Sequence, residues 1–175
     1  MPDLRLDDND FEWFGLSERF AIDRADLDAR WRQMQASAHP DRFAADGASA
    51  QRLAMQWSVR INEAYRRLRE PLSRAAYLCE LRGAPIDAQR NTAMPGDFLL
   101  QQMAWREALD EAHDDAALAK LEHEVRSAES EQFAQLAHWL DEEANPARAA
   151  ERVRALMFIQ RFRADLGERL DSLQH

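Results

Sequence analysis

The chain has 175 residues, of which 46% are hydrophobic and 31% charged, with a net charge of −9 at pH 7. This length suits one medium domain or two small ones, and the acidic balance argues against a nucleic-acid-binding protein. No apolar run reaches 18 residues, which excludes a membrane-spanning helix, and a single cysteine, Cys79, excludes an internal disulfide. Few glycines and prolines and abundant Ala, Leu, Arg, Glu and Gln favour helices, so we expect a cytoplasmic, all-α protein.

A short aromatic cluster near the N-terminus predicts a brief first helix or anchor: Phe11, Trp13, Phe14 and Leu16. Asp23 is suited to cap a second helix, whose apolar stripe is Leu27, Trp31, Met34 and Ala38. Pro40 disfavours the helical conformation at the preceding residue, so this helix should end near Ala38. Residues 41–49 are predicted to form a loop. The next stripe is Leu53, Trp57, Ile61, Ala64 and Leu68, and the two helices should pack as an antiparallel hairpin.

The C-terminal half predicts a separate helical bundle. Pro71 should open a helix that ends at Gly83, and the glycine- and proline-containing stretch 83–96 is predicted to be a linker. We therefore expect one domain over residues 1–82, with its connecting helix, and another over residues 97–175. The second domain should be a three-helix bundle with antiparallel neighbours, at about 97–112, 114–140 and 146–173, with Asn145 as a cap.

Charge is distributed unevenly along the chain. Residues 1–28 carry three arginines against nine acids, residues 29–75 carry nine arginines against four acids, and residues 76–175 carry eleven bases against nineteen acids. The segment that holds the predicted hairpin is therefore basic within an acidic chain. That pattern fits an acidic protein partner, and it fits a solvated helix face equally well.

The tripeptide His39-Pro40-Asp41 lies where the two helices of the hairpin are joined. Here the sequence resembles the J-domain, the helical module that stimulates ATP hydrolysis by DnaK-class chaperones. The resemblance implies that these three residues and Arg42 contact the chaperone. The arginines expected to dock on an acidic chaperone surface are Arg24, Arg30 and Arg32. On the residues alone, Pro40 could instead only break the helix, with His39 and Asp41 capping its ends.

The resemblance extends over nearly the whole chain. The segments Asn62-Glu63-Ala64-Tyr65, Leu68-Arg69-Glu70-Pro71-Leu72 and Arg74-Ala75-Ala76-Tyr77-Leu78, followed by a helical bundle, are similar to HscB-like J-proteins of iron–sulfur cluster biogenesis. Such proteins bind an IscU-like cluster scaffold with the C-terminal bundle and deliver it to an HscA-like, DnaK-class chaperone. The resemblance therefore implies a co-chaperone with two protein partners, which is not an enzyme and needs no cofactor.

One helix of the predicted bundle carries a second apolar face. At roughly 100° per residue, Phe98 and Trp105 share the core stripe, whereas other apolar side chains point away from it: Leu99, Leu100 and Met103. An apolar patch with a charged rim is typical of a protein-binding surface. The HscB resemblance implies that the scaffold binds Leu99, Leu100, Met103, Arg106 and Glu107. It also places Phe158 in this surface, although the position of Phe158 on the last helix is equally compatible with burial.

Other chemistry is weakly represented in the sequence. Asp110 and His113 have the acid-x-x-His spacing of a bundle di-metal site, but such a site needs two of these pairs and further carboxylates, so we expect no metal. The sequence contains no nucleophile–base motif and no glycine-rich phosphate loop. Two functions stay open: a chaperone-recruiting adaptor, and a helical protein-interaction module without a chaperone partner.

Overall fold

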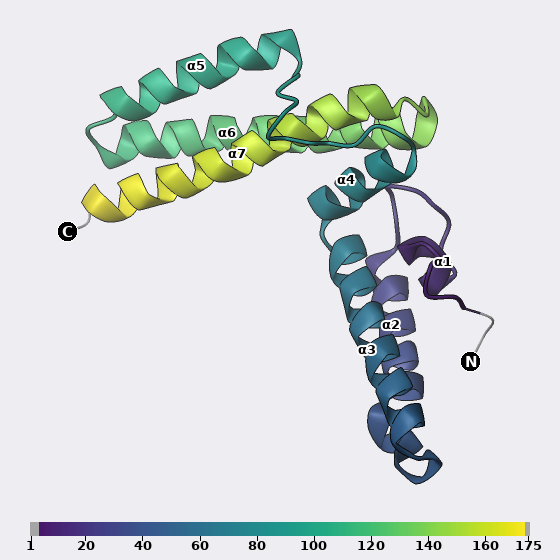
Figure 1. The fold of residues 1–175 in the computed structure, drawn as a ribbon. Coiled ribbons are helices and arrows are strands. Elements are labelled where there is room, and N and C mark those ends of the chain that lie inside the picture. The colour runs from purple at the N-terminus through teal and green to yellow at the C-terminus, as the bar shows by residue number, and fades with distance from the viewer. Residues whose placement is uncertain (1–3, 174–175) are drawn as a thin grey trace. The chain divides into compact units, whose positions relative to one another are not determined.

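The computed structural model describes residues 4–173, and within that range it contains helices and no strands (Figure 1). The predicted all-α fold is confirmed. No helix of the described range is long and apolar enough to cross a membrane. The elements are α1 (Asp10–Phe14), α2 (Arg24–Ala38), the 3-10 helix η1 (Pro40–Asp46), α3 (Ala48–Arg69), α4 (Pro71–Leu81), α5 (Gly96–Glu111), α6 (Asp115–Ala137), the π-helical turn η2 (His138–Glu142) and α7 (Pro146–Leu173).

The chain divides into two compact units, Met1–Tyr77 and Leu78–His175. In the first unit, the predicted N-terminal anchor is the short helix α1, which is fixed at both ends. The Asn9 side chain accepts a hydrogen bond from the amide of Glu12, whose carboxylate accepts one from the amide of Asn9. Gly15 ends the helix in the left-handed region, at φ 60°, where glycine is unstrained. The helix buries its aromatic side chains: Phe11, Trp13 and Phe14.

The helices α2 and α3 lie side by side and form the predicted hairpin (Figure 1). The predicted cap is confirmed, because the Asp23 carboxylate accepts hydrogen bonds from amide groups in the first turn of α2. Trp31 of α2 stacks on Tyr65 of α3 with ring centroids 4.5 Å apart, and its indole N–H donates to Asn62 Oδ1 at 3.1 Å. The buried apolar residues of the two helices are Leu27, Ala38, Ala54, Ile61, Ala64 and Leu68.

Two predictions about the tip of the hairpin are wrong. Residues 41–49 are not a simple loop, since η1 and the first turn of α3 occupy most of this stretch. Leu53, predicted as a core residue, is 49% exposed, and its neighbour Ala54 is buried in its place. Helical spacing from Trp57 and Ile61 is compatible with either Leu53 or Ala54 on the buried side, and the structure buries Ala54.

A buried carboxylate, Asp10, ties α1 to α3. Asp10 is fully buried, and its oxygens form ion pairs with Arg60 Nη1 at 2.6 Å and with Arg67 Nη1 at 3.1 Å. Its amide N–H donates to the Tyr77 hydroxyl oxygen at 2.9 Å. A carboxylate removed from water needs such partners, because an unpaired buried charge is strongly destabilising. The sequence analysis did not predict this cluster, since its members are far apart in the chain.

The second unit begins inside α4, whereas the sequence predicted a boundary at residues 83–96. That stretch packs within the second unit, where Ile86 is buried. The guanidinium of Arg154 on α7 is also buried and donates to the carbonyl oxygens of Ile86 at 3.0 Å and of Ala93 at 3.1 Å. These bonds satisfy an arginine that is otherwise costly to bury. Arg154 therefore holds the segment in front of α5 against α7.

The helices α5, α6 and α7 form the predicted three-helix bundle with antiparallel neighbours (Figure 1). Asn145 accepts a hydrogen bond from the amide of Arg148, which confirms the predicted cap of α7. Trp105 of α5 stacks on Phe162 of α7 with ring centroids 5.7 Å apart. The helix predicted over residues 114–140 changes to the π-helical turn η2 at His138. The bundle thereby places one side of α5 against α7 and leaves the other side to solvent.

Candidate functional site

The tripeptide His39-Pro40-Asp41 lies at the junction of α2 and η1 in the first unit. His39 ends α2 in an extended conformation, at φ −61° and ψ 128°, as expected before a proline. The side chains of His39 and Asp41 are 58% and 90% exposed. The amide of Asp41 donates to His39 Nδ1 at 3.3 Å, so the His39 side chain caps the first turn of η1. Both polar side chains are presented to solvent on one short turn.

Other residues satisfy the carbonyl groups at the end of α2. Arg42 Nη1 donates to the Ala36 carbonyl at 3.1 Å, and the Ser58 hydroxyl donates to the Ala38 carbonyl at 3.1 Å. The last carbonyls of a helix have no partner within the helix and need such donors. Arg42, predicted as a chaperone contact, is exposed but also anchors this end of α2. The end of α2 is therefore held without the His39 and Asp41 side chains.

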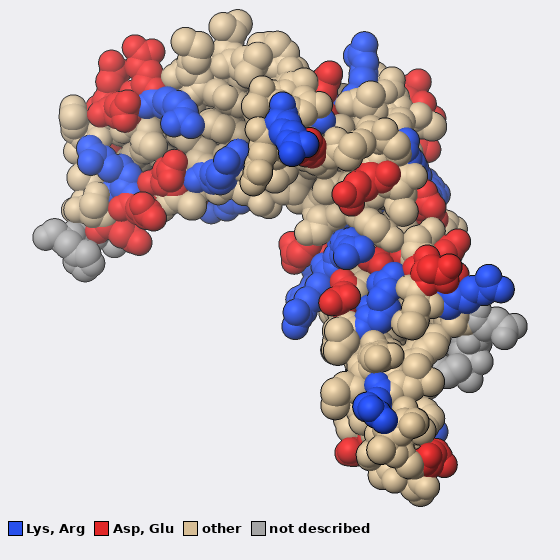
Figure 2. Space-filling view, in the orientation of Figure 1, with Lys and Arg blue, Asp and Glu red and all other residues tan. Residues whose placement is uncertain are grey.

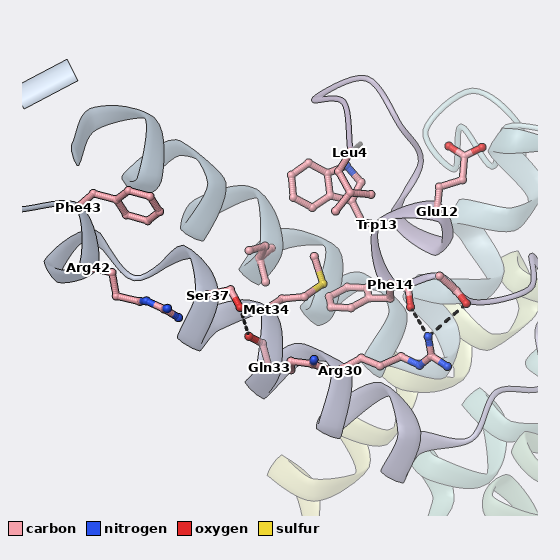
Figure 3. A pocket seen from close by; sticks show the side chains of 12 residues that line it. Leu4, Glu12, Trp13, Phe14, Arg30, Gln33, Met34, Ser37, Arg42 and Phe43 are labelled. Atoms are coloured by element: carbon pink, nitrogen blue, oxygen red, sulfur yellow. Dashed lines mark hydrogen bonds between the residues drawn. The ribbon is translucent and has the colours of Figure 1, made fainter. Parts of the chain in front are cut away.

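The three arginines of α2 that are expected to dock on the chaperone divide into two groups. Arg24 and Arg32 are exposed. Arg30 is turned toward α1, where its Nη1 donates to the carbonyl oxygens of Phe14 at 2.9 Å and of Gly15 at 3.3 Å (Figure 3). The Arg30 side chain is still 41% exposed, and its part in docking on the chaperone stays a prediction. Its position on the helix turns it toward the unsatisfied carbonyl groups at the end of α1, which it caps.

A pocket of about 740 Å³ lies beside Arg30 in the first unit (Figure 3). Its lining includes the α1 side chains Trp13 and Phe14, Met34 of α2, and Phe43 of η1. The pocket wall is mostly apolar and runs from the anchor helix to the segment that follows the tripeptide. The sequence analysis did not predict it, because its walls come from separate parts of the chain.

In the second unit, α5 presents an apolar face to solvent. Leu99, Leu100 and Met103, which we call the α5 patch, are 47%, 71% and 69% exposed. Arg106 and Glu107 on the same helix are exposed as well. Figure 2 shows mostly uncharged surface along α5, and charged side chains near the end where α5 meets α6. The structure thus brings the five residues predicted on this helix to its solvent-facing side.

Phe158 does not share this exposure. It is 7% exposed, and its ring packs on Phe98 and Phe162 with centroid distances of 5.9 Å to each. Of the two alternatives left open by the sequence, the structure shows burial. The Arg106 guanidinium lies over the Phe158 ring, 5.3 Å from its centroid. Phe158 therefore lies beneath the charged edge of the α5 patch.

A second exposed apolar pair, Met55 and Val59 on α3, was not singled out by the sequence analysis. The two side chains are 60% and 52% exposed and line a shallow groove of about 420 Å³ together with Arg52 and Glu63. The signal was present in the sequence, because the pair has helical i, i+4 spacing and lies outside the buried stripe of α3.

The titratable groups of the described residues bear on two kinds of site, a metal site and a reactive thiol. Across residues 4–173, no three His, Cys, Asp or Glu side chains are grouped closely enough to hold a metal ion. Cys79 is buried, and burial raises the pKa of its thiol to about 11. A thiol with this pKa is almost entirely protonated near neutral pH, so Cys79 is a packed side chain and a poor nucleophile.

Comparison with known proteins accounts for both units. Residues 94–167 match the family model described as the HSCB C-terminal oligomerisation domain. The chain is 46% identical to a co-chaperone protein HscB homolog of Burkholderia mallei, over 98% of this chain and 99% of that protein. The chain belongs to the HscB co-chaperone family. Another HscB homolog, from Cupriavidus taiwanensis, is 47% identical over 97% of this chain and 98% of its own length.

Solved HscB structures share the fold. Chaperone HscB from Vibrio cholerae matches with a TM-score of 0.78 at 32% identity, covering 95% of this chain and 99% of its own. The human co-chaperone protein HscB matches with a TM-score of 0.83 at 25% identity, covering 100% and 85%. The resemblance and the fold of a J-domain followed by a C-terminal helical bundle are therefore confirmed. The HscB relatives are named as co-chaperones, not as enzymes.

Proposed function

We propose that this HscB-family chain binds an IscU-like iron–sulfur cluster scaffold through α5 and delivers it to an HscA-like, DnaK-class chaperone in the cytoplasm. In this proposal His39-Pro40-Asp41 contacts the chaperone and stimulates its ATPase activity. The observation that carries the chaperone half is the exposure of the His39 and Asp41 side chains, next to an end of α2 that other residues hold in place. Polar side chains exposed in this way are available to a partner.

The basic segment 29–75 of the first unit, with nine arginines against four acids, supports an acidic docking surface on the chaperone. Arg24 and Arg32 are the exposed arginines of α2, and together with Arg42 they bring positive charge to the helix that leads into the tripeptide. Electrostatic complementarity of this kind speeds association and orients the partners. Arg30 contributes in a different way in this proposal, since it fastens α1 to α2.

The α5 patch supports the scaffold half of the proposal. Its three apolar side chains are largely exposed, and the exposed charges of Arg106 and Glu107 lie next to them. Exposed apolar clusters with polar rims are common in protein–protein interfaces, where a few side chains carry most of the binding free energy. The two proposed sites lie in different compact units, so each can be altered without changing the residues of the other.

The test is ATP turnover by a DnaK-class chaperone with the wild-type chain, His39→Gln and His123→Gln, each with and without a cluster scaffold. His123 is an exposed histidine on α6 and serves as the matched control. We expect stimulation by the wild type and by His123→Gln, and its loss in His39→Gln with an unchanged melting temperature. Equal stimulation by His39→Gln would contradict the role of the tripeptide. A folded wild-type chain that stimulates no chaperone would instead favour a plain protein-interaction module.

A further inference from the structure

Ser58 is a half-buried serine in the middle of α3 whose hydroxyl group bonds to a different helix. The hydroxyl group donates to the Ala38 carbonyl oxygen of α2 at 3.1 Å. A serine inside a helix can instead bond to a carbonyl of its own helix, as Ser37 does with Gln33 at 3.0 Å (Figure 3). Serine also forms helices less readily than alanine does. The Ser58 hydroxyl group therefore connects α3 to α2 at a position where alanine would suit the helix better.

The carbonyl group that Ser58 satisfies is the last one of α2. The final carbonyl groups of a helix have no partner within that helix. Ala38 is 0% exposed, so its carbonyl oxygen depends on a donor from the protein, and a buried carbonyl without one is destabilising. The nearby Ala36 carbonyl receives its donor from Arg42, which directly follows the tripeptide. Ser58 thus ties the residue in front of the tripeptide to the opposite helix of the hairpin.

The backbone is stiff from the Ala38 carbonyl group to Pro40. The carbonyl oxygen of Ala38 and the Cα of His39 lie in one planar peptide group. A proline restricts the backbone of the residue before it, and its own φ is fixed by the ring. His39 accordingly has φ −61° and ψ 128°. A hydrogen bond that holds the Ala38 carbonyl oxygen therefore also limits where His39 and Pro40 can lie.

We propose that Ser58 is a positioning residue for the chaperone contact, which holds His39-Pro40-Asp41 in the orientation that the chaperone binds. Ser58 acts through the Ala38 carbonyl group and does not itself contact the chaperone. The inference rests on the proposed function, namely that the tripeptide contacts the chaperone. A turn that is ordered in advance spares the chaperone the cost of ordering it. Loss of the hydroxyl group lowers the fraction of chains with an ordered turn, and the apparent affinity falls with that fraction.

The first test measures amide hydrogen exchange in the free protein and needs no chaperone. The Arg42 amide donates to the His39 carbonyl oxygen at 3.0 Å, so its exchange rate reports the opening of the turn. We expect exchange about fivefold faster in Ser58→Ala and Ser58→Val, the factor that one intramolecular hydrogen bond typically contributes to an equilibrium constant. Ser58→Thr keeps a hydroxyl group and should behave like the wild type. Ser37→Ala is the matched control, because its hydroxyl group bonds within α2. Unchanged exchange in Ser58→Ala and Ser58→Val would overturn the positioning role.

The second test titrates a DnaK-class chaperone with each variant and measures ATP turnover. Ser58→Ala and Ser58→Val should raise the concentration for half-maximal stimulation by a factor of about two to five, because the ordered fraction cannot fall by more than the opening constant rises. Maximal stimulation at saturation should be unchanged, whereas His39→Gln should lose it. Ser58→Thr should match the wild type in both quantities. Asn62→Ala is the control for hairpin stability, since Asn62 accepts another bond between α2 and α3, from the Trp31 indole N–H. It should leave the half-maximal concentration unchanged.

Two results of the titration would refute the inference. A wild-type half-maximal concentration in Ser58→Ala would show that the tripeptide does not need the hydroxyl group, and alanine favours the helix, so this variant tests the proposal even if Ser58→Val fails to fold. An equal rise in Asn62→Ala would show that hairpin stability matters and not the position of the turn. If the wild-type chain stimulates no chaperone, the proposed function fails, and Arg42 exchange still decides whether Ser58 orders the turn. If it stimulates and the Ser58 variants do not differ from it, the positioning role alone fails.

Discussion

Replacing the whole α5 patch by alanine should separate client binding from folding. Fully burying a Leu or Met side chain is worth roughly 1.5–3 kcal/mol. Because Leu99, Leu100 and Met103 are 47%, 71% and 69% exposed, a partner that covers them has close to two side chains of surface left to bury. We expect the triple Leu99/Leu100/Met103→Ala variant to lose at least about 1.4 kcal/mol of scaffold binding, which is a tenfold rise in Kd.

The same exposures limit the cost to folding. Substitutions of exposed surface residues usually change stability by no more than about 0.5 kcal/mol, and only Leu99 is half-buried. We therefore expect the melting temperature of the triple variant to fall by no more than about 5 °C. Phe98→Ala removes a buried ring of the same helix and should cost about 3–5 kcal/mol, so it shows how a core substitution behaves.

Calorimetric titration with the scaffold and thermal melting measure the two quantities on the same samples. A Met55/Val59→Ala variant is the matched control, since it removes comparably exposed apolar surface from α3 in the first unit and should bind scaffold normally. ATPase stimulation without scaffold should also stay normal in the triple variant. A triple variant that melts like Phe98→Ala would refute the reasoning, because the patch would then belong to the core. Unchanged affinity in a folded triple variant would refute the client site.

Three further predictions follow from the charged and titratable groups. Arg154→Leu should lower the free energy of unfolding, measured by urea titration, by about 2–4 kcal/mol, because the Ile86 and Ala93 carbonyls lose a buried donor. An unchanged free energy of unfolding would show that water replaces the guanidinium as the donor. Arg24/Arg32→Gln should weaken chaperone binding at about 50 mM salt but much less at about 500 mM, and a salt-independent effect would exclude electrostatic docking. Burial favours the neutral Cys79 thiol and raises its pKa to about 11 in the folded chain. The resulting contribution to the free energy of unfolding is fully present below pH 9, the usual pKa of the thiol. This contribution should be lost as the pH rises from about 9 through about 11, by up to about 1.36 kcal/mol per pH unit. The Cys79→Ala variant should not show this loss in denaturant titrations at these pH values.

The sequence by itself determined the main helices, two of their caps and the exposed face of α5. Asp23 and Asn145 cap α2 and α7 because short polar side chains satisfy the first amide groups of a helix locally. Helical periodicity separated Phe98 and Trp105 from the exposed residues Leu99 and Leu100, since both faces belong to one helix. The tripeptide His39-Pro40-Asp41 was recognisable for a similar reason: it is contiguous, and the proline ends the helix before it.

Only the tertiary structure decided features that depend on residues distant in the chain. Arg30 and Arg154 have the same side chain as the exposed arginines, and the carbonyl groups brought next to them by folding decide that they hold backbone segments. Asp10 became a buried ion-pair centre because α3 supplies two arginines around it. Phe158 was compatible with exposure or burial on its own helix, and the approach of α5 buried its ring under Arg106. Periodicity describes one helix at a time, whereas burial and pairing depend on which helix lies opposite.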